Sequence, residues 1–206
     1  MTTEKEKMIA AQLYRSNDAV LKAEMKRGRQ LTRLFNTSTE EQLDYRTTLL
    51  KQLFAKTGEQ LYIEPNLRCD YGTNITVGES FYANYDCVLL DVAPITIGDN
   101  VMFGPRVSLL TASHPLDATV RNSGLEYGEA ITIGDNVWLG GSVTVNPGVT
   151  IGVNTIIGSG SVVTKTMPAN VIAAGNPCRV IRELTTADKQ LWEEKQAAYW
   201  ADYEND

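Results

Sequence analysis

The chain has 206 residues, of which 43% are hydrophobic, enough for one domain with a sizeable core and short appendages. Its formal net charge of −6 argues against a broad nucleic-acid-binding surface. No apolar run approaches the ~20 residues of a membrane-spanning helix, and the first residues lack the apolar core of a secretory signal. We therefore expect a cytoplasmic protein without a membrane or nucleic-acid partner.

Helical spacing of apolar residues marks the first part of the chain, residues 4–55. The pattern runs through Met8, Leu13, Leu21, Met25, Leu31 and Leu34, and then through Leu43, Leu49, Leu50 and Leu53. We interpret residues 1–59 as a helical segment that caps the open end of the structure following it.

A six-residue repeat organises the middle of the chain, and such repeats decide the fold. Successive units begin at Ile133, Leu139, Val145, Ile151, Ile157 and Val163. The first position is always Ile, Leu or Val, the second is usually Gly or Asn, and the fifth is small or β-branched. Residues 97–107 keep the same frame, whereas residues 77–90 repeat at six but are offset by two residues around Pro94.

This pattern predicts a triangular prism of short parallel strands, with one strand and one corner for each hexapeptide. Three hexapeptides would complete a coil, with the first and fifth side chains pointing inward and successive coils stacked at the ~4.8 Å strand spacing. Gly and Asn would supply the left-handed backbone angles of the corners. Cys69 and Cys87, which are separated by the length of three hexapeptides, would lie one coil apart on the same inner row. The fold class is therefore mainly β, a parallel β-helix over residues 60–183.

One insertion, residues 111–130, interrupts the repeat and is expected to leave the prism as an extruded loop. It carries the chain's only histidine, His114, within Ser113-His114-Pro115. Loops longer than ~12–15 residues in a compact repeat are usually functional. The three cysteines, by contrast, are expected to be small core residues, and we expect no metal site.

A last helix is predicted after Arg182, within residues 184–206, because residues 185–188 carry a helix-start signal. The segment is rich in aromatic residues, namely Trp192, Tyr199, Trp200 and Tyr203. The helix either closes the far end of the prism or packs on a neighbouring subunit.

With the repeats and the histidine loop in view, the chain resembles the hexapeptide-repeat acyltransferases, and among them the maltose and galactoside O-acetyltransferases. The resemblance covers nearly the whole length and is carried by residues 3–10, 13–16, 68–72, 90–92, 121–124, 126–128, 146–152 and 174–181. It implies that the β-helix is left-handed, an exception to the usual crossover rule. It also implies a homotrimer with active sites between subunits, acetyl-CoA as the donor, and a sugar resembling maltose or glucose as the acceptor.

Acetyl transfer to a hydroxyl needs a base for the attacking alcohol and hydrogen-bond donors for the oxyanion. His114 has the only side chain whose ordinary pKa lies near neutrality, and it matches the family's catalytic histidine. Glu126, on the same loop, is expected to hold the second imidazole nitrogen. By resemblance, Asn84 faces the reacting centre and the donor, although corner asparagines are common for backbone reasons alone. Gly141 would offer a backbone N–H to the thioester oxygen.

The resemblance also assigns the substrate contacts. The expected donor contacts, which include the basic groups that phosphates require, are Asn84, Gly141, Ser159, Thr164, Lys165, Arg179 and Arg182. For the sugar, carboxylates and an aromatic face are the expected partners. The candidate sugar contacts are Ser16 and Asp70 by family position, with Tyr82 and Asp91 close by in sequence.

Three other functions compete with this interpretation. The same enzyme type could take a different acceptor, such as a galactoside, an aminosugar, an antibiotic or serine. A zinc hydro-lyase built on the same prism would need three histidines, and this chain has one. A non-catalytic solenoid would need no histidine-bearing insertion.

Overall fold

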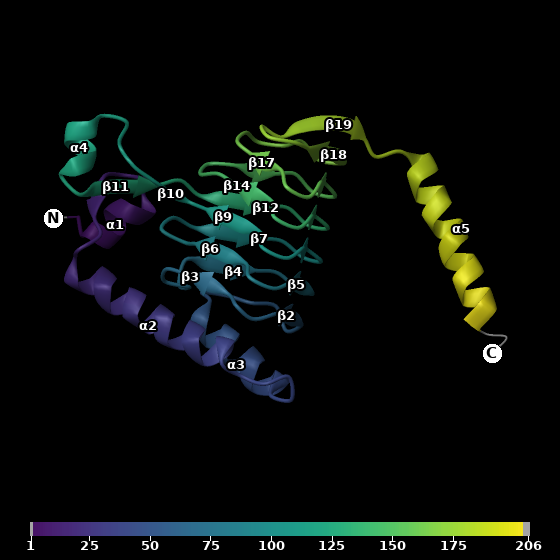
Figure 1. Ribbon diagram of the computed structural model, residues 1–206, viewed down its shortest axis with the longest axis horizontal. Coiled ribbons are helices and arrows are strands. Elements are labelled where there is room, and N and C mark those ends of the chain that lie inside the picture. The colour runs from purple at the N-terminus through teal and green to yellow at the C-terminus, as the bar shows by residue number, and fades with distance from the viewer. Residues whose placement is uncertain (1, 204–206) are drawn as a thin grey trace.

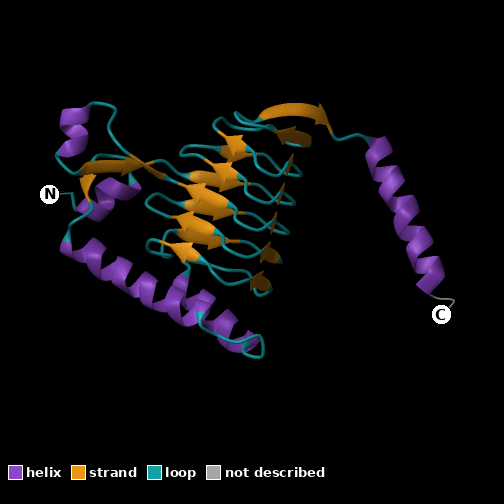
Figure 2. Ribbon diagram, in the orientation of Figure 1, coloured by secondary structure: helices purple, strands orange, loops and turns teal. Residues whose placement is uncertain are grey.

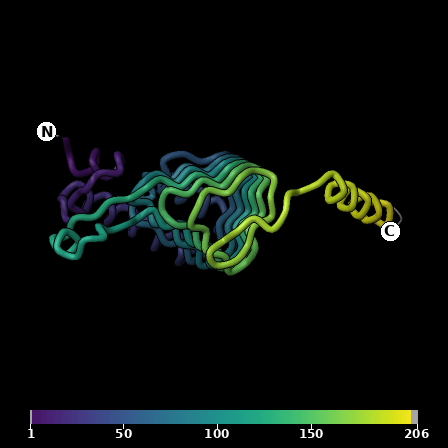
Figure 3. Tube along the Cα trace, turned by 90° about the horizontal axis from the view of Figure 1, so that it is seen from above, coloured from purple at the N-terminus to yellow at the C-terminus, as the bar shows by residue number. Residues whose placement is uncertain are grey.

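The computed structural model describes residues 2–203, and its strands form a parallel β-helix with a triangular cross-section (Figure 3). Residues 204–206 of the predicted last segment lie outside the described residues. The parallel β-helix predicted from the hexapeptides is confirmed, as is the left-handed form that the resemblance implies. Among the described residues, no helix has both the length and the apolar character needed to cross a bilayer.

Three stacked sheets form the faces of the prism, as the orange strands of Figure 2 show. Face 1 consists of β4 (Ile75–Val77), β7 (Ile95–Ile97), β12 (Ile131–Ile133) and β15 (Thr150–Ile151). Face 2 consists of β2 (Leu61–Ile63), β5 (Phe81–Ala83), β8 (Met102–Phe103), β13 (Trp138–Leu139), β16 (Ile156–Ile157) and β18 (Val171–Ala174), with β19 (Arg179–Glu183) at its edge. Face 3 consists of β3 (Arg68–Cys69), β6 (Val88–Leu90), β9 (Ser108–Leu110), β14 (Thr144–Val145) and β17 (Val162–Val163). The 1–2 corner joins faces 1 and 2, and the 2–3 and 3–1 corners join the other pairs of faces in the same way.

The predicted coil of three hexapeptides is correct only for the second block of repeats. There, Val145 pairs with Val163, its equivalent three hexapeptides further along the chain. In the first block, Cys69 pairs with Leu89 and Leu89 with Leu109, so each of these coils is longer. The excess lies at the 3–1 corner, which holds two extra residues. Cys69 and Cys87 are therefore not on one inner row, although both are buried.

The left-handed backbone angles fall on the fourth position of the hexapeptide, where Asn and Gly supply them as expected. Asn100, Asn136 and Asn154 have φ of 55°, 57° and 55°. The glycines at the second position serve a different need, which is close stacking of the coils. A Cβ on Gly98 would lie 2.8 Å from the backbone nitrogen of Asp135 in the next coil, so any side chain there would force the coils apart.

Two helices cover the open first coil, as predicted for a cap (Figure 1). They are α2 (Ala19–Asn36), whose first turn is capped by the Asp18 carboxylate, and α3 (Leu43–Leu53). Phe35 and Leu50 from these helices belong to the same buried cluster as the inward side chains of the coils. The cap thus removes from water the apolar end that an unstacked coil would expose.

The insertion leaves the prism at the 3–1 corner and projects from it (Figure 3). It contains β10 (Ala112–Ser113), α4 (Ala118–Asn122) and β11 (Leu125–Gly128). β11 pairs antiparallel with β10 on one side and with β1 (Tyr14–Arg15) on the other. β1 and the preceding α1 (Glu4–Ile9) are anchored to the 3–1 corner by a second buried cluster, made of Met8, Tyr14, Leu21, Tyr71 and Val92.

The last helix, α5 (Thr186–Tyr203), stands away from the prism (Figure 1). Its first turn is tied to β19 by a two-point ion pair between Arg182 and Asp188, at 2.6 and 2.8 Å. The possibility that this helix closes the far end of the prism is therefore wrong, which leaves packing on another subunit as the open alternative.

Candidate active site

The 2–3 corner brings several of the predicted residues into one column along the prism. Asn84 follows β5, and Gly104, Gly140 and Gly158 occupy the equivalent place in the coils above it. Each of these residues donates its backbone N–H to the strand of the next coil, at 2.8 to 3.0 Å. Gly141 and Ser159 each lie one residue further into this corner. The structure therefore places three of the predicted acetyl-CoA contacts, Asn84, Gly141 and Ser159, on one edge.

The Asn84 side chain is half-buried and has a defined orientation. Its carboxamide oxygen accepts a hydrogen bond of 2.8 Å from the Tyr85 N–H. The carboxamide nitrogen donates to no acceptor among the described residues. With its oxygen engaged, Asn84 is equipped to donate a hydrogen bond, which is the capacity that a developing oxyanion requires.

Backbone donors at this corner are also left open. The N–H groups of Gly141 and Ser159 have no acceptor within residues 2–203. At the 1–2 corner, carboxylates satisfy this N–H group only in the earlier coils: Asp135 accepts from the Asp99 N–H at 2.8 Å, and Asp99 from the Glu79 N–H at 2.7 Å. The N–H groups of Asp135 and Val153, which are level with Gly141 and Ser159, also have no acceptor among the described residues. What distinguishes the 2–3 corner is that its open N–H groups share an edge with the free carboxamide nitrogen of Asn84.

His114 lies on the other side of face 3, directly after β10, and its side chain is exposed. In the β10–β11 pair, Ala112 lies opposite Gly128 and Ser113 opposite Tyr127. One further step in this register sets His114 opposite Glu126. Residues opposite one another in antiparallel strands project to the same side, so this register, continued by one residue, would make the two side chains neighbours.

Glu126 is fixed by a partner that the sequence did not reveal. Tyr14 of β1 is opposite Glu126 in the β1–β11 pair, and its hydroxyl donates to Glu126 Oε1 at 2.7 Å. Burial and the neighbouring carboxylate raise the pKa of Tyr14, so its hydroxyl keeps the proton and remains a donor. Glu126 Oε2 has no bond to a described residue. No hydrogen bond joins Glu126 to His114 in the structure, and their predicted pairing remains a proposal.

A single subunit does not assemble all the predicted catalytic groups. Asn84 and Gly141 lie at the 2–3 corner, whereas the loop with His114 leaves from the 3–1 corner and projects away from the prism (Figure 3). Face 3 separates the two corners.

The four candidate sugar contacts are divided in the same way. Ser16 follows β1 and Asp70 follows β3, so both lie on the side of the histidine loop. Tyr82 lies on face 2, two residues before Asn84, with its ring stacked on that of Tyr62 at 5.9 Å. Burial raises the pKa of Asp70, and Arg29 opposes this shift.

Asp91 has a structural place at the 3–1 corner and is inaccessible to a sugar. Its side chain is 0% exposed. Its carboxylate accepts from the backbone N–H groups of Asp70, Tyr71 and Asn74, at 2.9 to 3.2 Å. We therefore assign Asp91 to holding the enlarged corner rather than to the acceptor.

The Asp91→Asn variant should change how stability depends on pH. Burial raises the pKa of Asp91 to about 6, so the folded state binds this proton more tightly than the unfolded chain does. Wild type should therefore lose stability as pH rises from about 4 to about 6, and change little above. Relative to the variant, the loss should be about 3 kcal/mol, measured by urea unfolding across this range. A constant difference between the two proteins would contradict the raised pKa.

The predicted phosphate contacts gather at the end of the prism that is farthest from the helical cap. Thr164 and Lys165 follow β17, and both side chains are exposed. Arg179 begins β19 and donates to the Cys178 carbonyl at 2.8 Å. The Arg182 guanidinium is engaged by Asp188, so a phosphate would have to compete with that carboxylate for it.

A hexapeptide prism with open donors at one corner and a histidine loop at another defines a hexapeptide-repeat transferase. Two family models match the chain, namely the maltose acetyltransferase hexapeptide capping motif at residues 7–58 and the bacterial transferase hexapeptide (six repeats) at residues 130–165. Galactoside O-acetyltransferase of Escherichia coli K12 is 43% identical over 187 residues, or 91% of this chain and 92% of that protein.

Solved structures agree with this match. A maltose O-acetyltransferase from Clostridium difficile 630 is 55% identical, with a TM-score of 0.88 over 89% of this chain and 98% of that one. A galactoside acetyltransferase in complex with coenzyme A is 43% identical, with a TM-score of 0.89 over 92% of this chain and 94% of that one. The chain belongs to the hexapeptide-repeat acetyltransferases, in the group of the maltose and galactoside O-acetyltransferases, which confirms the resemblance seen in the sequence.

Proposed function

We propose that this protein transfers the acetyl group of acetyl-CoA to a hydroxyl of a sugar that resembles maltose or glucose. The observation that carries the proposal is the 2–3 corner, where the Asn84 amide and the N–H of Gly141 are donors without acceptors among the described residues. The coenzyme A complex of the 43%-identical galactoside acetyltransferase supports the donor. Lys165 and Arg179 would contact its phosphates.

The reaction needs one proton to leave the sugar hydroxyl and one to reach the departing sulfur. His114 takes the proton of the sugar hydroxyl while the hydroxyl oxygen attacks the thioester carbon. The negative charge that forms on the carbonyl oxygen is stabilised by Gly141 N–H and by the Asn84 amide. The carbon–sulfur bond then breaks, and the proton held by His114 goes to the departing sulfur. The products are the acetylated sugar and coenzyme A with a free thiol.

The separation of the two corners leads us to propose that the active site forms between subunits of a homotrimer. The histidine loop of one subunit would reach the 2–3 corner of the next, where its base meets the open donors. Closed rings of identical subunits repeat one contact around an axis, so every site in a trimer would be the same.

Acceptor identity is tested by acetyl-CoA-dependent thiol release with maltose, glucose, a galactoside, an aminosugar and a control without acceptor. We expect release that depends on maltose or glucose and exceeds the acceptor-free rate by at least about tenfold, as transfer rather than hydrolysis requires. Turnover with the galactoside or the aminosugar alone would keep the donor and the base but reassign the acceptor. Failure to bind acetyl-CoA would favour the non-catalytic solenoid.

A further inference from the structure

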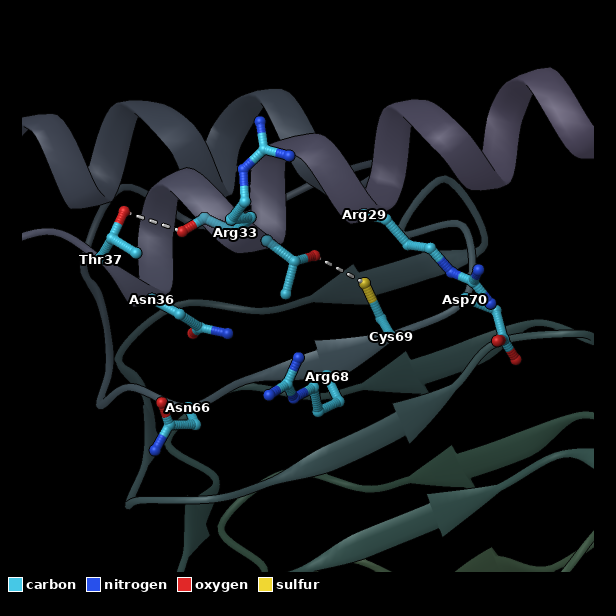
Figure 4. Close-up of a pocket in the computed structure, with 9 residues that line it drawn as sticks. Arg29, Arg33, Asn36, Thr37, Asn66, Arg68, Cys69 and Asp70 are labelled. Carbon is cyan, nitrogen blue, oxygen red and sulfur yellow. Dashed lines mark hydrogen bonds between the residues drawn. The ribbon is translucent and has the colours of Figure 1, made fainter.

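A cavity of about 540 Å³ lies between α2 and the first coil, at the capped end of the prism. Its lining residues are Arg29, Thr32, Arg33, Asn36, Thr37, Asn66, Arg68, Cys69 and Asp70. Figure 4 shows Arg29 directed from α2 toward Asp70, Arg68 on the strand opposite, and the Arg33 guanidinium turned away from that strand. Three arginines from two elements thus line one pocket, and the exposed Arg33 side chain would turn toward Arg68 to meet a ligand there.

Two arginines of this pocket, Arg33 and Arg68, are not neutralised by the protein, whereas Arg29 lies near the Asp70 carboxylate. The side chains of Arg29, Arg33 and Arg68 form no ion pair and no hydrogen bond with any of residues 2–203. A neighbouring groove along α2 adds Lys22 and Lys26 and shares Arg29 and Arg33 with the pocket. Grouping unpaired cations is unfavourable, and in a chain of net charge −6 it creates a local site for an anion.

The neutral polar groups of the lining are engaged in holding the pocket together. The Asn36 side chain donates to the Leu67 carbonyl at 2.8 Å and accepts from the Leu67 N–H at 2.9 Å, which ties α2 to the segment before β3. The Thr32 hydroxyl donates to the Gly28 carbonyl at 2.7 Å. The walls are therefore fixed, and the free recognition groups are the guanidinium forks.

Arginine forks match oxyanions that can accept two parallel hydrogen bonds, and phosphate is one of these. The pocket volume falls in the range of small-molecule sites. Asp70 is the carboxylate of the lining and lies near Arg29, so an anion would sit beside Arg33 and Arg68, away from that charge. A hydroxyl next to the phosphate would find its acceptor in Asp70.

We propose that this pocket binds the phosphate group of a small molecule, with Arg33 and Arg68 as its ligands. The phosphate is either free or carried by a sugar phosphate. The site is separate from the proposed donor contacts, because Lys165 and Arg179 lie at the opposite end of the prism. It adjoins the candidate sugar contact Asp70, which lines the same pocket, but phosphate binding by Arg33 and Arg68 does not require the proposed acetyl transfer.

Binding is tested by isothermal titration of glucose 6-phosphate, and separately of inorganic phosphate, into full-length protein kept saturated with coenzyme A. Saturation blocks the phosphate contacts of the donor site. We expect R33Q/R68Q to weaken binding by at least about tenfold, and R33K/R68K, which keeps the charge but loses the fork, to weaken it less. The control is K189Q/K195Q on α5, which removes the same charge elsewhere and should bind as wild type does.

Thermal unfolding followed by circular dichroism verifies that each variant is folded. Tighter binding of glucose 6-phosphate than of inorganic phosphate assigns a sugar phosphate to the pocket, and equal binding assigns the free ion. No binding to wild type, or equal affinity in wild type and the folded R33Q/R68Q and single R33Q and R68Q variants, would overturn the proposal.

Discussion

Replacing His114 by alanine should lower kcat by roughly 10²–10⁴, the usual contribution of a general base. His114 is the only imidazole of the chain and is exposed at the end of β10, on the one insertion that leaves the repeat. No other side chain on this loop has an ordinary pKa near neutrality. The rate of thiol release at saturating acetyl-CoA and sugar measures the effect.

The same experiment needs a variant that alters the loop but not the base. Leu116 is 95% exposed and two residues away, so Leu116→Ala should leave kcat near the wild-type value. A folded His114→Ala variant that loses less than about threefold in kcat would remove His114 from the role of base. A raised KM for acetyl-CoA with unchanged kcat would instead make it a binding residue.

The hexapeptide pattern determines the prism because its first position selects the inward side chains in every coil. Ile133 and Ile151, for example, are paired on face 1 and fully or almost fully buried, as their place in the repeat predicts. Periodicity alone could not give the length of the first coils. The two additional residues at their 3–1 corner shift the frame of the repeat but leave its six-residue period unchanged on either side. The offset around Pro94 was the visible sign of this enlargement.

Some residues of the candidate site could be predicted from the sequence, whereas others depend on contacts that the sequence does not show. The roles of Asn84 and Gly141 are predicted from the family resemblance, because the repeat frame places both residues at a corner but does not show which corner residues would meet a ligand. The pairing of Tyr14 with Glu126 joins residues 112 positions apart through strands that no repeat encodes. The prediction of Asp91 as a sugar contact is wrong because the sequence does not show which groups donate hydrogen bonds to a carboxylate. They can be backbone N–H groups or a ligand.

The two-corner arrangement can be tested by mixing subunits. His114→Ala and Asn84→Ala chains, each with a different affinity tag, are co-expressed, and molecules that carry both tags are purified. Each parent should be nearly inactive, because loss of an oxyanion donor costs about 10²–10³ in kcat. If a site takes its histidine from one subunit and its asparagine from the next, every mixed trimer contains one site with both residues intact.

That single intact site should restore about one third of the wild-type rate, a gain of tens-fold or more over either parent. A mixture of the two parents purified separately and assayed at once is the control, since it contains no mixed trimers. Mixed molecules no more active than the parents would mean that both residues act from the same chain. Because an intact pair in one chain is absent from every such molecule, recovered activity can arise only across a subunit boundary.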